Sequence, residues 1–184
     1  PHESNYAYAY AKRMLEVQTR CYREQYGLNY SCIIPSNIYG INDNFNLSDG
    51  HVIPVLIHKC YLAKKNNSNF EVWGTGNPLR EFVFAEDVAR VSEWLLENYR
   101  GSSPVIVSSD EEVSIRELVE VIIQEMKFKG KVVWKKEMPD GQLRKPSDNS
   151  LLKTLVPEFS FTSLRDGIAK TVQDFEKNYK MKRK

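Results

Sequence analysis

Short apolar runs alternate with amphipathic segments along this sequence, and this alternation constrains the fold more than any other feature. Residues 30–35, 70–73 and 105–108 have the length and apolar character of buried strands. Residues 4–26 instead place Tyr10 and Met14 on one side of a helix, which Gly27 ends. Strands that alternate with helices predict an α/β protein.

Capping residues and turn-forming residues place the remaining elements. Ser114 and Glu117 have the spacing of a capping box, in which the serine side chain accepts a backbone N–H and the glutamate reaches back. Residues 36–50 and 139–150 are polar and are predicted to be loops. Further helices are predicted over residues 51–65, 86–99, 114–127 and 164–179, and further extended segments over 82–84 and 131–135.

The composition excludes several classes of partner. The chain has 184 residues, of which 41% are hydrophobic and 27% charged, and 26 basic residues nearly balance 24 acidic ones. We expect no nucleic-acid partner, because no basic stripe is interleaved with aromatic residues. No apolar run approaches the roughly 20 residues that a membrane-spanning helix needs, so no membrane partner is expected.

The three cysteines, Cys21, Cys32 and Cys60, are widely spaced and odd in number. They form neither a Cys-x-x-Cys pair nor a cluster with metal-ligand spacing, so we expect no disulfide framework and no metal site. A reducing compartment suits such a chain, which predicts a cytoplasmic protein.

Tyr8 and Lys12 carry the sharpest chemical signal. They are four residues apart on a predicted helix, so both lie on one face. A neighbouring ammonium makes it easier for a phenol to release its proton, and a ketone that receives a hydride needs a proton at its oxygen. Because the same spacing is common on solvated helix faces, the pair needs support from the rest of the chain.

Five motifs follow the pair in a fixed order. They are PSNIYG at 35–40, DGHVIP at 49–54, WGTGNPLREF at 73–82, AEDVA at 85–89 and DGQLRK at 140–145. In this order, over residues 4–179, the chain resembles the extended short-chain dehydrogenases that act on nucleotide sugars. Within that group it is most similar to the family of GDP-4-keto-6-deoxy-mannose 3,5-epimerase/4-reductases.

The resemblance implies the C-terminal part of a Rossmann-type parallel sheet together with a smaller α/β substrate-binding domain. Residues 1–40 would end an NADP-binding domain, whose N-terminal half is not in this sequence. Residues 41–184 would be mainly the substrate-binding domain, with segments around 80–110 returning to the Rossmann domain. A Gly-x-Gly-x-x-Gly turn is indeed absent: Gly74 and Gly76 lack the third glycine.

The resemblance also implies NADP(H) as the cofactor and assigns the chemical roles. Tyr8 would donate the proton in ketone reduction, and Lys12 would support it and hold the nicotinamide ribose. His51 would move protons at the carbons beside the ketone, as imidazole can near neutral pH, and would contact the cofactor. It could instead bond to the backbone at the start of a helix. The other implied cofactor-binding residues are Pro35, Ser36, Asn37 and Ile38.

The implied substrate-binding residues are Lys59, Trp73, Arg80 and Asp140. Lysine and arginine can neutralise a diphosphate, an aromatic ring can stack, and a carboxylate can accept hydroxyl groups. Each has a simpler interpretation. Lys59 could be an exposed helix residue and Trp73 a core residue. Arg80 could pair locally with Glu81, and Asp140 could merely shape a turn.

The implied activity is NADPH-dependent epimerisation and reduction of GDP-4-keto-6-deoxy-D-mannose to GDP-L-fucose. The implied assembly is a homodimer in which the helix of Tyr8 joins a four-helix interface. Another nucleotide-sugar epimerase or dehydratase remains an alternative, as does a non-catalytic NADP-binding regulatory subunit. The family's catalytic cysteine and a serine that assists the tyrosine lie upstream of Tyr8, so the 184-residue chain alone is expected to be inactive.

Overall fold

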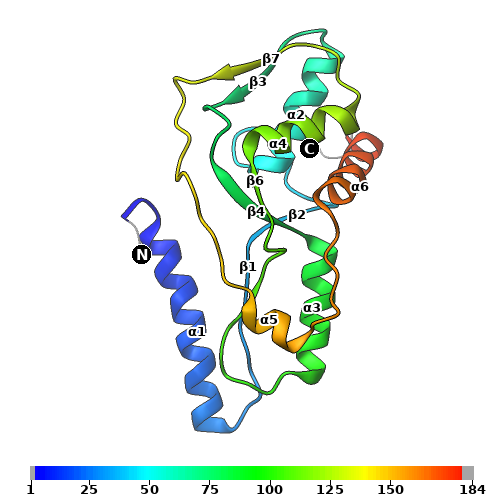
Figure 1. Cartoon of the computed structure of the whole chain (residues 1–184). Helices are drawn as coiled ribbons and strands as arrows, with labels where there is room; N and C mark the ends of the chain where they lie inside the picture. The colour runs from blue at the N-terminus through cyan, green and yellow to red at the C-terminus, as the bar shows by residue number, and fades with distance from the viewer. Residues whose placement is uncertain (1–2, 180–184) are drawn as a thin grey trace.

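The computed structural model describes residues 3–179 as two lobes with one long helix at their side (Figure 1). The helices are the 3-10 turn η1 (Glu3–Asn5), α1 (Tyr6–Tyr26), α2 (Val52–Lys65), α3 (Ala85–Asn98), α4 (Ile115–Met126), α5 (Ser150–Leu155) and α6 (Leu164–Asn178). The strands are β1 (Ile33–Pro35), β2 (Asn37–Tyr39), β3 (Phe70–Trp73), β4 (Leu79–Phe84), β5 (Val105–Val107), β6 (Glu112–Ser114) and β7 (Val132–Lys135).

These strands form three small sheets. β1 pairs with β5 and β3 pairs with β7, both in parallel. In the third sheet, β4 lies between β2, which runs parallel to it, and β6, which runs antiparallel. The predicted α/β class with mainly parallel pairing is confirmed.

β1 and β2 are one extended stretch that changes partners at Ser36. The Ser36 N–H still donates to the carbonyl of Val107 on β5, at 3.0 Å. From Asn37 onward the stretch pairs with β4, beginning at Phe82. The prediction of a loop throughout residues 36–50 is therefore wrong, because the partner strand lies far along the chain and local composition does not reveal it.

Each lobe has its own apolar core. In the upper lobe of Figure 1, α2, α4 and α6 pack together, and α4 buries one face through residues three and four positions apart. Its Leu118 and Ile122 are fully buried, which contributes about 1.5–3 kcal/mol per side chain. In the lower lobe, α3 and α5 cover β5, burying Val91, Val105 and Leu152 in a second cluster.

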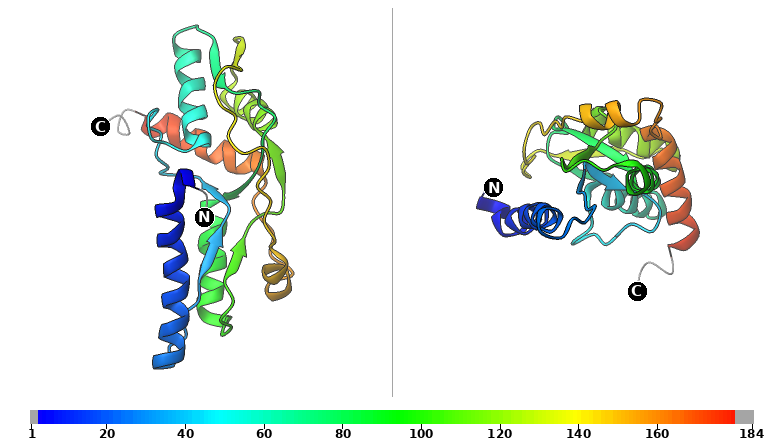
Figure 2. Two further views of the ribbon diagram at one scale, coloured as in Figure 1. Left: turned by 90° about the vertical axis from the view of Figure 1, so that its left-hand side faces the viewer. Right: turned by 90° about the horizontal axis from the view of Figure 1, so that it is seen from below.

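Helix α1 contributes no buried residue to either core. Gly27 ends it as predicted, with φ of 64° and its N–H bonded to the carbonyl of Arg23 at 3.0 Å. The Arg23 guanidinium ties this end to the lower lobe by donating to the carbonyls of Tyr30 and Arg100, at 2.7 and 2.8 Å. Figure 2 shows α1 along the side of the molecule, so most of its surface is left uncovered.

Besides β2, two further elements were not predicted, and one strand is longer than predicted. Helix α5 begins at the end of the predicted loop 139–150, and the three-residue strand β6 precedes α4. β4 begins at Leu79 instead of residue 82, since its first half pairs with β6. The capping box at the start of α4 is confirmed: Glu117 N–H donates to the Ser114 hydroxyl at 3.1 Å, and Ser114 N–H to the Glu117 carboxylate at 2.7 Å.

None of the helices between residues 3 and 179 has both the length and the apolar character that crossing a membrane requires. The same residues contain no group of three or more His, Cys, Asp or Glu side chains arranged to hold a metal ion.

Candidate functional site

A pocket of about 250 Å³ opens where β4 meets the turn at residues 74–78. Residues from five separate parts of the sequence line it, and four of these residues carry roles predicted from the sequence: Asn37, Trp73, Arg80 and Asp140. The other lining residues are Val52, Gly76, Pro78, Ile115 and Pro139. The fold therefore gathers one predicted cofactor-binding residue and three predicted substrate-binding residues at one cavity.

Asp140 is held in this pocket by Thr75. Its carboxylate accepts the Thr75 backbone N–H at 2.7 Å and the Thr75 hydroxyl at 2.6 Å. These bonds, led by the one from the hydroxyl, hold the pKa of the Asp140 carboxyl below its ordinary value. The carboxylate thus stays charged, and its free lone pairs can accept ligand hydroxyls. Its contact with Thr75 also shows that it does more than shape its own turn.

The turn at residues 74–78 is rigid because close neighbours surround it. A Cβ on Gly74 would lie 2.1 Å from the Asp140 carboxylate, and one on Gly76 would lie 2.6 Å from the Trp134 ring. Both glycines also have φ of 81°, which side chains disfavour. Arg116 supports the turn by donating to the Thr75 carbonyl at 2.8 Å. Its guanidinium carbon also lies 4.5 Å from the centre of the Trp134 ring, in cation–π contact.

Arg80 lies on β4, is half-buried as a residue and lines the pocket. It donates to the carbonyl of Leu79 at 2.7 Å and forms no ion pair with any residue between 3 and 179. The interpretation as a local pair with Glu81 does not hold, because neighbouring strand residues point to opposite faces and Glu81 is buried elsewhere. Most of the guanidinium's donors therefore remain for an anionic ligand.

Lys59 and Trp73 meet at the edge of this pocket. The Lys59 ammonium lies 4.4 Å from the centre of the Trp73 ring, in cation–π contact. Trp73 is 58% exposed, so the interpretation as a core residue is wrong. Lys59 is half-buried, and burial lowers its pKa although the carboxylate of Glu71 opposes the shift. Together they offer an exposed ring and a partly desolvated cation.

His51 is the residue immediately before α2, and the next residue, Val52, lines the pocket. The His51 side chain is exposed and makes no capping hydrogen bond to the helix. The simpler interpretation, an imidazole bonded to the helix backbone, is therefore not what the structure shows. His51 is thus an exposed residue that directly precedes a pocket-lining residue in the sequence.

Tyr8 and Lys12 lie together on α1, as their spacing predicts. The Lys12 ammonium is 5.5 Å from the centre of the Tyr8 ring, and the Tyr8 side chain is 60% exposed. Neither residue lines the 250 Å³ pocket. The structure thus brings the pair together but leaves it outside the cavity that gathers the substrate-binding candidates.

The predicted cofactor-binding segment coincides with the change of partner between β1 and β2. Pro35 and Ser36 are half-buried there, whereas Asn37 and Ile38 are exposed. The Ser36 hydroxyl is buried and has no hydrogen-bond partner among the described residues. Asn37 donates its amide to the Glu81 carbonyl at 2.7 Å. A buried hydroxyl without a partner suits contact with a polar ligand group.

Thr75, Arg116 and Glu81 shape this site, although no role was predicted for them from the sequence. Thr75 stands inside the motif at residues 73–82, so a signal for it was present. Glu81 stands inside the same motif, but its contact with Ser147 joins segments that are distant in the chain. Nothing local marks Arg116, whose contact with Thr75 is also distant in the sequence.

A second hollow, of about 410 Å³, lies between the C-terminal ends of α2 and α4 and contains none of the predicted residues. Lysines line it, among them Lys64, Lys127 and Lys131. Lys64 donates to the Met126 carbonyl at 2.7 Å, which is the usual way a cation complements a helix C-terminus. This hollow is therefore explained by helix capping.

The fold and the site together define a member of a known family. A family described as "NAD dependent epimerase/dehydratase family" matches residues 1–108, and this chain belongs to it. The resemblance seen in the sequence motifs is thereby confirmed.

Within this family, the chain is similar to several individual proteins. The chain is 47% identical, over its whole length, to "GDP-L-fucose synthase" of Dictyostelium discoideum, and 40% identical over 95% of its length to "GDP-L-fucose synthase 1" of Arabidopsis thaliana. It spans 58% and 54% of the lengths of these relatives. The crystal structure of a GDP-L-fucose synthetase from Naegleria fowleri bound to NADP matches with a TM-score of 0.95 and 40% identity, covering 100% of this chain and 60% of that one.

Proposed function

We propose that the full-length protein epimerises GDP-4-keto-6-deoxy-D-mannose at the two carbons beside its ketone and reduces the ketone with NADPH, forming GDP-L-fucose. The observation that carries this proposal is the pocket lined by Trp73, Arg80 and Asp140, because it combines groups for each part of a GDP-sugar. The relatives named GDP-L-fucose synthase support the same activity.

The pocket's side chains suit a charged nucleotide sugar. Arg80 and Lys59 provide positive charge for a diphosphate, and the exposed face of Trp73 offers a surface for stacking. Asp140 remains ionised and accepts sugar or ribose hydroxyls. A pocket with both signs of charge favours a ligand with anionic and hydroxyl-bearing parts over a simple anion.

The cofactor proposal is NADP(H), which is bound in the Naegleria fowleri structure. In this chain, Lys12, His51 and the segment from Pro35 to Ile38 would hold it, and the unpartnered Ser36 hydroxyl fits such a contact. When bound, NADPH supplies the hydride for the reduction. The bound sugar ring would then lie between these residues and the 250 Å³ pocket.

The proton chemistry falls to two residues of this chain. Tyr8 gives its phenolic proton to the ketone oxygen, and Lys12, whose ammonium lies 5.5 Å from the centre of the Tyr8 ring, holds the nicotinamide ribose. His51 removes and returns protons at the carbons next to the ketone, because imidazole exchanges protons readily near neutral pH. Its exposed position before Val52 leaves the ring free to reach a ligand in the pocket.

The same proposal covers domains, assembly and location. Residues 1–40 and a segment around 80–110 form one domain, which the pairing of β1 with β5 supports, and the rest of residues 41–184 forms the substrate-binding domain. A homodimer through α1 is supported by the exposure of Tyr6, Tyr10 and Met14.

A cytoplasmic location is proposed for the protein because Cys21, Cys32 and Cys60 are all free, and free thiols suit a reducing compartment.

The decisive experiment gives the full-length protein NADPH and GDP-4-keto-6-deoxy-D-mannose and follows NADPH absorbance together with the sugar product. We expect one NADPH consumed per GDP-L-fucose formed. Conversion without net NADPH consumption would favour another epimerase or dehydratase of the superfamily. A folded protein without any turnover would favour a regulatory subunit.

We further propose that the 184-residue chain alone is inactive and binds NADP weakly, because it contains no Gly-x-Gly-x-x-Gly turn for the pyrophosphate. Titration of the purified chain with NADP tests this point. A tight affinity would contradict it.

A further inference from the structure

Residues 139–149, here called the strap, run from β7 to α5 without regular secondary structure and contribute Pro139 and Asp140 to the pocket (Figure 1). A segment of this kind keeps a defined position only through its contacts with neighbouring elements. At its last residue, the buried Asn149 amide donates to the Ser108 carbonyl at 2.8 Å. Along the rest of its length, four contacts attach it to the turn at 74–78, to β4 and to β6.

Three of these contacts involve exposed groups or a single backbone hydrogen bond. The Asp140 carboxylate bonded to Thr75 is exposed. The carbonyl of Leu143 accepts a single backbone N–H from Leu79 at 2.9 Å. Arg144 donates to the Glu112 carboxylate through Nε at 2.9 Å and through Nη2 at 2.5 Å, but the Arg144 side chain is 60% exposed. Water screens exposed charges, so these bonds add less stability than the same bonds would in a buried place.

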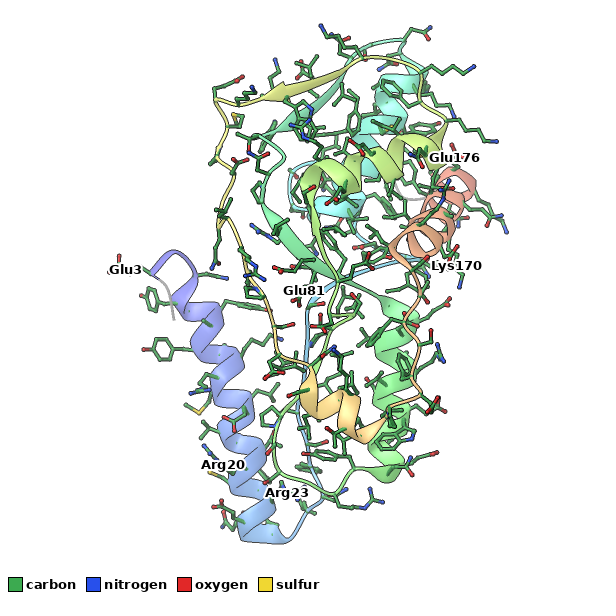
Figure 3. The ribbon with its side chains drawn as sticks, in the orientation of Figure 1. Glu3, Arg20, Arg23, Glu81, Lys170 and Glu176 are labelled. Atoms are coloured by element: carbon green, nitrogen blue, oxygen red, sulfur yellow. The ribbon has the colours of Figure 1, made fainter. Side chains whose placement is uncertain are left out.

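The fourth contact is buried and involves a carboxylate. Glu81 is 3% exposed and lies between the strap and the crossing strands in the middle of the molecule (Figure 3). Its side chain accepts the backbone N–H of Ser147 at 2.9 Å, the hydroxyl of Ser147, and the hydroxyl of Ser108 at 2.7 Å. Hydrogen bonds to a buried carboxylate are stronger than neutral ones, so this is the firmest of the four anchors.

Glu81 also stands next to the other walls of the pocket. It directly follows Arg80 on β4, and its own carbonyl accepts the side-chain amide of Asn37 at 2.7 Å. One residue therefore joins β2, β4 and the strap, and each of these contributes a lining residue of the pocket. A shift at this junction would change the spacing between Arg80 and Asp140.

We propose that Glu81 is a positioning residue that fixes the strap against β4 and so sets the distance between Arg80 and Asp140 that a GDP-sugar requires. The proposal rests on the function proposed above. Glu81 would not touch the ligand itself, because the groups around its carboxylate are serines of the strap and of the segment after β5.

A purely structural interpretation is the main competitor. A buried carboxylate with good partners costs stability when a partner is lost, whether or not it positions anything. The two interpretations differ in what happens to ligand affinity. If Glu81 only stabilises the fold, its loss lowers the melting temperature without a specific effect on the nucleotide.

The test compares variants of the full-length protein in which either Glu81 or its partner in the strap, Ser147, is changed. Glu81→Gln removes the charge, and Ser147→Ala removes only the strap's hydroxyl. Ser147→Thr restores that hydroxyl. Ser109→Ala is the matched control, because the Ser109 hydroxyl also donates one bond near this point, to the Phe82 carbonyl at 3.1 Å, but does not touch the strap. Each variant is assayed for GDP affinity by calorimetry, for NADPH affinity, for KM and kcat with GDP-4-keto-6-deoxy-D-mannose, and for melting temperature.

We expect Glu81→Gln and Ser147→Ala to weaken GDP binding and raise KM by about five- to tenfold, as the loss of one charge-assisted hydrogen bond predicts. NADPH affinity and kcat should stay within about twofold, and Ser147→Thr should recover most of the GDP affinity. Unchanged GDP affinity in Ser147→Ala, or an equal loss in Ser109→Ala, would overturn the proposal, even if Glu81→Gln fails to fold.

The GDP titrations also separate this proposal from the proposed function. If the wild-type protein binds GDP but does not convert the keto sugar, the proposed function is wrong, and the affinities of the variants still decide the role of Glu81. If the wild-type protein does not bind GDP, both proposals are overturned.

Discussion

The carboxylate of Asp140 accepts two hydrogen bonds from Thr75, one from its backbone N–H and one from its hydroxyl, across 65 positions of sequence. The strap is thereby joined to the turn that follows β3, and a charged oxygen is fixed at the pocket. The absence of a side chain on Gly74 makes this contact possible, since a Cβ there would lie 2.1 Å from the same carboxylate.

Thr75→Val should raise the pKa of the Asp140 carboxyl toward its ordinary value, because the hydroxyl contributes most to the present lowering. A carboxyl whose folded pKa is lowered stabilises the folded state above its unfolded pKa and loses that effect as the pH falls through the folded pKa. The variant should therefore lose the Asp140 charge at a higher pH. A ¹³C NMR titration of the carboxyl measures this, and Thr75→Ser, which keeps the hydroxyl, should leave the titration close to wild type.

Arg80→Lys should raise the KM for the GDP-sugar by about 10- to 100-fold with a smaller change in kcat, because an ammonium cannot form the two parallel bonds of a guanidinium. Steady-state kinetics of the full-length protein measure both constants. Arg90→Lys is the control, since Arg90 stacks over Phe159 and pairs with Asp87 on α3. An equal rise of KM in both variants would show that the Arg80 effect is not specific to the pocket.

Gly76→Ala should lower the free energy of unfolding by about 3 kcal/mol or more, because it combines a left-handed backbone with a collision against the Trp134 ring. Gly27→Ala has a similarly left-handed backbone, with φ of 64°, but nothing lies within 4 Å of its Cβ, so it should cost only about 1 kcal/mol. Urea denaturation measures the difference. Equal losses in the two variants would contradict the close packing of the turn.

Cys60 should resist alkylation in the folded protein, whereas Cys21 should react readily. Burial raises the pKa of the Cys60 thiol to about 12, although the nearby Lys64 opposes the shift, so very little thiolate is present at pH 8. Cys21 is exposed on α1. Mass spectrometry after a short treatment with iodoacetamide distinguishes the two sites, and rapid labelling of Cys60 without denaturant would contradict the packing of α2.

Local signals in the sequence predict much of the fold. The capping box of Ser114 and Glu117 and the turn at Gly27 each depend on residues within a few positions, and both are confirmed. The helix predicted from residue 51 is confirmed as α2, which begins one residue later, at Val52. β2 and β6 were missed because each has only three residues and exists through pairing with β4. Helix α5 was missed because it is short and is held by contacts with the second core.

In the candidate site, too, local sequence signals predicted some features, whereas contacts between distant segments could not be predicted. Residues inside recognisable motifs, such as Trp73, Arg80 and Asp140, were found from the sequence, and the structure gathers them at one pocket. Thr75 and Glu81 lie in one of these motifs as well, but their positioning contacts, with Asp140 and with Ser147, could not be predicted because they join distant segments. A motif thus indicates which residues can bind a ligand, whereas the tertiary contacts that hold their side chains in place are not visible in the motif.

The central claim is that Tyr8 completes a reduction whose substrate occupies the pocket. It is tested most directly by Tyr8→Phe in the full-length protein, assayed in D₂O with NADPH and GDP-4-keto-6-deoxy-D-mannose. We predict that NADPH oxidation falls by about 100-fold or more, while deuterium still enters the carbons beside the ketone through His51. NADPH oxidation at the wild-type rate in Tyr8→Phe would contradict the claim.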